Sequence, residues 1–217
     1  MRLRLHRGGR FRRWLGHQLG GDEALGDRVW RRVLHGIVGA ILVYYALPNG
    51  IFVLAPKRTV LLAGLAAILV LELLRHLGVL ELPTIRPYER GRIGSYAFYA
   101  LAVVGAIVLF PEPVAAAVVL GTALIDPLAG ELRDHPRWAR TYPALPVAAY
   151  WGLAVVGLAG IGHWPLLDSL ALALLAAPIA VAAEWPTIAW FDDDLAMTFA
   201  PAIALYLVGA VALGLPR

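Results

Sequence analysis

Residues 165–183 read PLLDSLALALLAAPIAVAA, a run of 19 residues in which Asp168 is the single charged side chain. An α-helix needs about 20 mostly apolar residues to cross the hydrocarbon core of a bilayer. The run therefore predicts a membrane-spanning helix. Six further apolar runs of this kind lie at 33–48, 58–74, 95–110, 113–127, 144–161 and 195–213. Together they predict an all-α polytopic membrane bundle of about seven transmembrane helices.

The composition agrees with a membrane protein. Hydrophobic residues make up 60% of the 217 residues and charged residues 16%, whereas soluble domains average about 45–50% and about 25%. The chain has no cysteine, which excludes disulfides, thiolate metal sites and cysteine nucleophiles. Its net charge of +4 fits the basic cytoplasmic loops of a membrane protein, so we expect no nucleic-acid partner.

The charges are distributed unevenly along the chain. Sixteen of the 19 basic residues precede the first apolar run or lie in the connections after the second and fourth runs. Cytoplasmic loops are enriched in Lys and Arg, so the pattern predicts a cytoplasmic N-terminus and a charged cytoplasmic face. Most acidic residues lie on or near the same face, which that rule does not explain. The charged face is therefore either a polar site or a set of solvated loops. The same distribution divides the chain into a basic segment at 1–28 and a transmembrane domain at 29–217.

Three arginine-rich pieces occur at the ends of apolar runs. They are RRVLH at 31–35, ELLRH at 72–76 and RPYERGR at 86–92. The planar guanidinium group suits phosphate oxygens, so these pieces are candidates for binding phosphate. Each piece also has a plainer interpretation. The first would be a basic membrane anchor, the second a Glu–Arg pair at a helix end, and the third ordinary positive charge in a cytoplasmic loop.

Two acidic pieces complete the set, IDPLAGELR at 125–133 and FDDDL at 191–195, with Glu184 upstream of the second. Asp126 precedes a proline, so it either caps a new helix or holds a divalent metal, for which carboxylate oxygens are suitable ligands. The three consecutive aspartates either form a solvated turn at a helix N-terminus or share a cation.

The order of these pieces, together with EWPTIAWFDDDLAMTFAPAI at 184–203, resembles the CTP-dependent polyprenol kinase family over roughly residues 28–213. The family includes dolichol kinase, phytol kinase and the yeast-type diacylglycerol kinase. Such enzymes are integral membrane proteins that transfer the γ-phosphoryl group of CTP to the hydroxyl of a lipid alcohol. The resemblance implies a lipid-alcohol kinase that acts on an isoprenoid alcohol such as dolichol at the cytoplasmic face of the membrane.

The resemblance also implies roles for particular residues. Asp126 and Asp193 would be catalytic. The residues that it places on the nucleotide side are Arg31, His35, Glu72, Arg75, Arg86, Glu89, Arg90, Gly130 and Arg133. The residues that it places around a divalent metal, with Mg²⁺ favoured, are Asp126, Glu184, Asp192 and Asp193. CTP would be the co-substrate, and the partners would be the lipid alcohol, the nucleotide and membrane lipids.

The stretch from Glu131 to Pro143 departs from the family pattern. The family has a Lys and a Glu-Gly before its fifth span that are missing here, and Asp194 stands where the family has an amide. The chain also has no G-x-x-x-x-G-K-[ST] loop, which excludes an ordinary P-loop kinase. Two alternatives therefore stay open: a catalytically inactive relative that binds lipid phosphate, and a small membrane transporter. If the source is prokaryotic, the membrane would be the plasma membrane.

Overall fold

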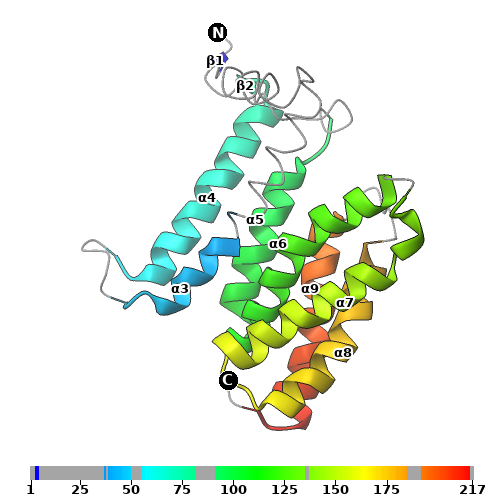
Figure 1. Ribbon diagram of the computed structural model, residues 1–217. Helices are drawn as coiled ribbons and strands as arrows, with labels where there is room; N and C mark the ends of the chain where they lie inside the picture. The colour runs from blue at the N-terminus through cyan, green and yellow to red at the C-terminus, as the bar shows by residue number, and fades with distance from the viewer. Residues whose placement is uncertain are drawn as a thin grey trace.

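The computed structural model of the chain describes residues 3–4, 37, 39–49, 55–81, 91–134, 137–184 and 192–215. The regular structure of these ranges is helical, apart from a two-residue parallel pairing of β1 (Leu3–Arg4) with β2 (Leu80–Glu81). The all-α prediction is therefore confirmed for the described part of the chain (Figure 1).

Five helices are long and apolar enough to cross a membrane. They are α4 (Lys57–His76), α6 (Glu112–Asp134), α7 (Ala144–Val155) with its π-helical continuation η4 (Val156–Ile161), α8 (Leu166–Ala183), and α9 (Asp193–Leu205) with its π-helical continuation η5 (Tyr206–Ala212). The described part of the chain is thus compatible with an integral membrane protein.

The two remaining apolar runs are less complete. α5 (Ser95–Leu109) has 15 residues, or about 22 Å of helix, which is shorter than the roughly 30 Å hydrocarbon core. The run at 33–48 falls partly outside the described residues, and its described part contains η1 (Ala40–Leu42) and α3 (Val43–Ala46). The count of seven spans and the cytoplasmic N-terminus therefore stay predictions.

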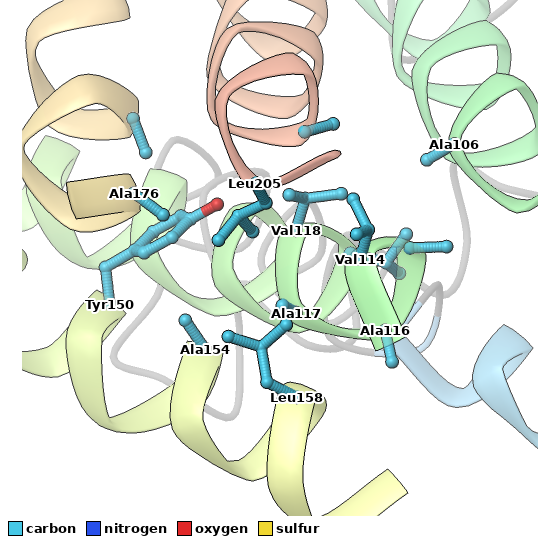
Figure 2. Close-up of a cluster of buried hydrophobic side chains, with 14 of the residues drawn as sticks. Ala106, Val114, Ala116, Ala117, Val118, Tyr150, Ala154, Leu158, Ala176 and Leu205 are labelled. Carbon is cyan, nitrogen blue, oxygen red and sulfur yellow. The ribbon is translucent and has the colours of Figure 1, made fainter. Parts of the chain in front are cut away.

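α6 is the central helix of the bundle. Its consecutive residues from Val114 to Val119 have no exposed surface, so they are covered on every side of the helix. α5, α7 with η4, and α9 all pack against it. Figure 2 shows Ala117 of α6 facing Ala154 and Leu158, with Val118 on the side of Leu205.

Glycines allow two of these contacts to be close. A Cβ atom at Gly157 of η4 would lie 2.4 Å from the backbone of Ala117, and one at Gly121 of α6 would lie 2.3 Å from the ring of Tyr150. Contact through small residues is typical of membrane helices, since association there depends on van der Waals packing.

α4 has the opposite character. The two residues of α4 that are buried are Glu72 and Arg75, whereas apolar side chains such as Leu73 are exposed. At its start, the Lys57 Nζ atom donates hydrogen bonds to the carbonyl oxygens of Tyr44 (3.1 Å) and Leu47 (2.8 Å). α4 is therefore attached by charged groups at both ends and exposes an apolar surface that suits lipid.

Short connections make consecutive helices antiparallel and gather particular helix ends together. Phe110 and Pro111 alone separate α5 from α6. An ion pair between Arg133 and Glu184 joins the C-terminal ends of α6 and α8. The C-terminal end of α4 meets the residues before α5 through Glu72 and Gly94. The described helix ends that flank the charged connections therefore lie toward one end of the bundle (Figure 1).

Candidate functional site

The ion pair at this end is asymmetric in its exposure. Arg133 Nη2 lies 2.5 Å from Glu184 Oε1, and the side chain of Glu184 is fully buried while that of Arg133 is 44% exposed. The Tyr142 hydroxyl donates to Glu184 Oε2 at 3.3 Å, and the Arg133 guanidinium lies 5.7 Å from the centroid of the Tyr142 ring. Burial raises the pKa of Glu184, while Arg133 and Tyr142 oppose that rise. A buried carboxylate of this kind depends on its partners.

Three consecutive aspartates begin α9 beside this pair. Asp192 is the N-cap residue, and its Oδ1 accepts a hydrogen bond from the backbone N–H of Asp194 at 3.1 Å. Asp193 Oδ1 lies 3.2 Å from the same nitrogen. One oxygen from each of the three carboxylates lies within 4.8 Å of the others. Burial, together with the charges of Asp194 and Asp193, raises the pKa of Asp192.

Electrostatic contacts link the aspartates to their surroundings. Glu184 interacts with Arg133, Asp193 and Asp194. The buried Tyr99 of α5 lies within electrostatic range of both Asp194 and Asp126. We call this group the polar end cluster. It consists of Tyr99, Asp126, Arg133, Tyr142, Glu184, Asp192, Asp193 and Asp194.

Asp126 enters this cluster from inside a helix. The sequence left open that Asp126 caps a new helix at Pro127, and this is wrong, because α6 runs unbroken from Glu112 to Asp134. Pro127 lacks an N–H group, so the carbonyl of Ala123 loses its intrahelical partner within that turn.

Two buried threonines extend the polar groups into the bundle. The Thr198 hydroxyl donates to the carbonyl oxygen of Asp194 at 2.8 Å, and its oxygen lies 3.1 Å from the Thr122 hydroxyl oxygen. Neither threonine has exposed surface. These hydroxyl groups thus join α9 to α6 one helical turn after Asp194.

Glu72 and Arg75 form a separate pair with internal partners. Arg75 donates to Glu72 through Nε (2.7 Å) and Nη2 (2.5 Å), and Nη2 also lies 2.6 Å from the carbonyl oxygen of Arg92. The N–H of Gly94 donates to Glu72 Oε1 at 2.9 Å, and the Tyr96 hydroxyl donates to Oε2. The visible role of this pair is to fasten α4 to the start of α5. Contact with a nucleotide stays a prediction for both residues.

The pair and the polar end cluster meet on one helix. Tyr96, which binds Glu72, and Tyr99, which interacts with the cluster, are three residues apart on α5. Residues at this spacing share a helix face and are separated by about 4.5 Å of axial rise. The two groups are therefore neighbours at the same end of the bundle.

The structure brings together five of the predicted site residues, which are Asp126, Arg133, Glu184, Asp192 and Asp193. Gly130 lies on α6 with open space beside its Cα, since a Cβ there would meet nothing within 4 Å. Glu72 and Arg75 form the separate pair described above. The other predicted residues lie outside the described part of the chain; these are Arg31, His35, Arg86, Glu89 and Arg90.

Sequence reasoning missed three members of the cluster. Tyr99 and Tyr142 read as ordinary aromatic side chains of membrane helices and their ends. Asp194 was left out in favour of its two neighbours, although it is the best buried of the three aspartates. The sequence did contain a pattern that indicates a buried polar position for Asp194. Asp194 and Thr198 are polar residues four apart on an apolar helix, so they face the same side.

Comparison with family models, curated proteins and solved structures found no match. Fold and site together describe a helical protein, compatible with an integral membrane protein, that has an ionisable cluster at one end of its bundle. What the chain does is therefore inferred from its own residues.

Proposed function

We propose that the chain is a lipid-alcohol kinase that transfers a phosphoryl group from CTP to an isoprenoid alcohol such as dolichol. The observation that carries the proposal is the convergence of Asp126, Arg133, Glu184 and Asp192–Asp194 at one end of a bundle of apolar helices. Phosphoryl transfer depends on positioning and on positive charge around the phosphate oxygens more than on covalent chemistry. Ionisable groups at a membrane edge are costly and tend to be functional.

Arg133 is suited to hold a phosphate group. Its Nη2 atom is fixed by the buried Glu184, while almost half of the side chain remains exposed. The exposed N–H groups can therefore face an incoming phosphate while the buried carboxylate keeps the guanidinium in place. Tyr142 contacts both members of the pair, through its hydroxyl to Glu184 and its ring to Arg133.

The aspartates fit a divalent cation. Asp192, Asp193 and Asp194 bring carboxylate oxygens within 4.8 Å of one another, and Mg²⁺ prefers oxygen ligands. These three residues, with Asp126 and Glu184 nearby, would hold the cation. A bound Mg²⁺ would neutralise charge on the phosphate oxygens during transfer. The same aspartates also cap α9, so their arrangement serves the helix with or without a cation.

In this proposal, Asp126 accepts the proton of the lipid hydroxyl. The hydroxyl oxygen forms a bond to the γ-phosphorus of CTP, the bond from that phosphorus to the bridging oxygen of CDP breaks, and the proton passes to a carboxylate oxygen of Asp126. Asp126 is half-buried in the C-terminal half of α6, toward the end that holds Arg133 and Glu184, so a lipid-borne hydroxyl would have to reach it from that end of the bundle.

The proposed topology has seven spans with the N-terminus in the cytoplasm, and the plasma membrane is the location if the source is prokaryotic. Five long apolar helices and the distribution of basic residues support it. The transmembrane kinase domain would occupy residues 29–217, after a basic cytoplasmic segment at 1–28.

The test is transfer of labelled γ-phosphate. The purified chain in detergent is incubated with labelled CTP, Mg²⁺ and a panel of lipid alcohols including dolichol. We expect a labelled lipid product that is lost in Asp126→Asn. Asp168→Asn is the matched control, because Asp168 lies in the first turn of α8, away from the end that holds Glu184.

A single elution peak from size exclusion must show that both variants are folded. Absence of transfer from CTP or ATP to every alcohol would sink the kinase proposal. The second candidate is then an inactive relative that binds lipid phosphate, which the exposure of the Arg133 guanidinium favours.

A further inference from the structure

The turn between α6 and α7 presents a basic and aromatic surface. Arg137, Trp138 and Arg140 are all exposed, and Trp138 shows 54% of its surface. We call these three residues the basic–aromatic turn. Within the described part of the chain, neither of its arginines makes an ion pair or a side-chain hydrogen bond. Arg75 and Arg133, in contrast, are held by Glu72 and Glu184.

The turn has a definite local structure. The backbone N–H of Thr141 and its hydroxyl both donate to the carbonyl oxygen of Trp138, at 2.8 and 2.6 Å. The N–H of Tyr142 donates to the carbonyl oxygen of Ala139 at 3.3 Å, which closes the 3₁₀ turn η3 (Ala139–Thr141). The two guanidinium groups and the indole are therefore presented by an ordered turn.

The turn directly precedes a candidate membrane span, where lipid headgroups would lie. The apolar span formed by α7 and η4 begins at Ala144, four residues after Arg140, and Leu145 is already exposed. Tryptophan is enriched at membrane–water interfaces, and Lys and Arg beside a span are attracted to anionic lipids. An exposed indole between two arginines that form no ion pair with any described carboxylate has the chemistry of a surface for anionic headgroups.

We propose that the basic–aromatic turn binds the phosphate groups of anionic phospholipids, with Trp138 seated among the headgroups. The partner is the lipid headgroup in the leaflet next to this end of the bundle. Tyr142 follows the turn directly and contacts Glu184, so lipid binding here would also hold the polar end cluster at the membrane surface. The proposal needs membrane insertion alone and stands whether or not the chain is a kinase.

The test is quenching of Trp138 fluorescence by brominated lipids in nanodiscs that contain the full chain. The chain has 7 tryptophans, so the signal of Trp138 is the difference between the wild type and Trp138→Phe. Discs of phosphatidylcholine carry a minor fraction of either brominated phosphatidylglycerol or brominated phosphatidylcholine. We expect stronger quenching by the anionic lipid, with each arginine contributing about a fivefold local enrichment.

Two variants and one competitor decide the interpretation. Arg137→Gln/Arg140→Gln should bring quenching by the two lipids to equality, whereas Arg58→Gln, an exposed arginine in the first turn of α4, should leave the preference intact. Equal quenching in the wild type, or a preference that survives the double substitution, would overturn the proposal. So would a preference abolished by inorganic phosphate at low millimolar concentration, which would point to soluble phosphate.

Discussion

Glu184 illustrates how a single residue depends on its partners at this site. Its carboxylate has no exposed surface, and Arg133 and the Tyr142 hydroxyl stabilise its charge. Removing one member of a buried pair leaves an uncompensated charge, whereas removing both members costs much less. Arg133 is partly exposed, so the pair is worth less than a fully buried one.

This dependence gives a prediction for Arg133. We expect Arg133→Gln to lower the free energy of unfolding by about 1–3 kcal/mol, because Glu184 loses its charged partner while it stays buried. The double variant Arg133→Gln/Glu184→Gln should recover most of that loss. Denaturant unfolding in detergent measures both.

Arg140→Gln serves as the control, since Arg140 is exposed, and its effect should stay within about 0.5 kcal/mol. A double variant as unstable as Arg133→Gln alone would contradict the prediction, because the unpaired charge of Glu184 would then not be the cause of the loss.

At the scale of elements, α6 and η4 approach each other so closely that their contact limits which residues fit. Gly157 faces the backbone of Ala117, and backbone atoms cannot move aside as a flexible side chain can. Gly64 on α4 is the contrasting case, because a Cβ there would meet nothing within 4 Å. The two helices therefore respond to the same substitution in opposite ways.

Gly157→Ala should lower the free energy of unfolding by about 1–3 kcal/mol through overpacking. Gly64→Ala should raise it by about 0.5–1 kcal/mol, because alanine loses less conformational entropy than glycine in a helix. Unfolding in one detergent compares the two variants directly. A loss of similar size in both would contradict the close contact between η4 and α6.

At the scale of the whole molecule, apolar runs predicted the helices well, because a length of about 20 apolar residues has few other uses. The boundary at Pro127 was wrong, since α6 continues to Asp134 and carries Arg133 to its partner. The pairing of Arg133 with Glu184 could not be predicted by spacing, because the two residues lie on different helices. Tyr99 and Tyr142 were missed because an aromatic ring near a span has an ordinary explanation.

The predicted orientation can be tested with single introduced cysteines, because the chain itself has no cysteine that would also be labelled. Ala139→Cys places a thiol in the turn after α6, and Glu112→Cys places one at the first residue of α6; both positions are exposed. In intact cells, a membrane-impermeant maleimide should label residue 112 and reach residue 139 only after permeabilisation. The reverse pattern would contradict a cytoplasmic polar end cluster.

The burial of α6 has a consequence for how the protein enters the bilayer. Its span has a mean hydropathy of 1.6, the lowest of the five candidate spans in the described part of the chain, against 2.1 for α8. Partitioning into lipid by itself therefore favours α6 least of the five. Its alanines are instead buried against neighbouring helices, so packing stabilises this span. During synthesis we expect α6 to enter the membrane as a hairpin with α5 or α7, so that assembly and insertion are one event for this helix.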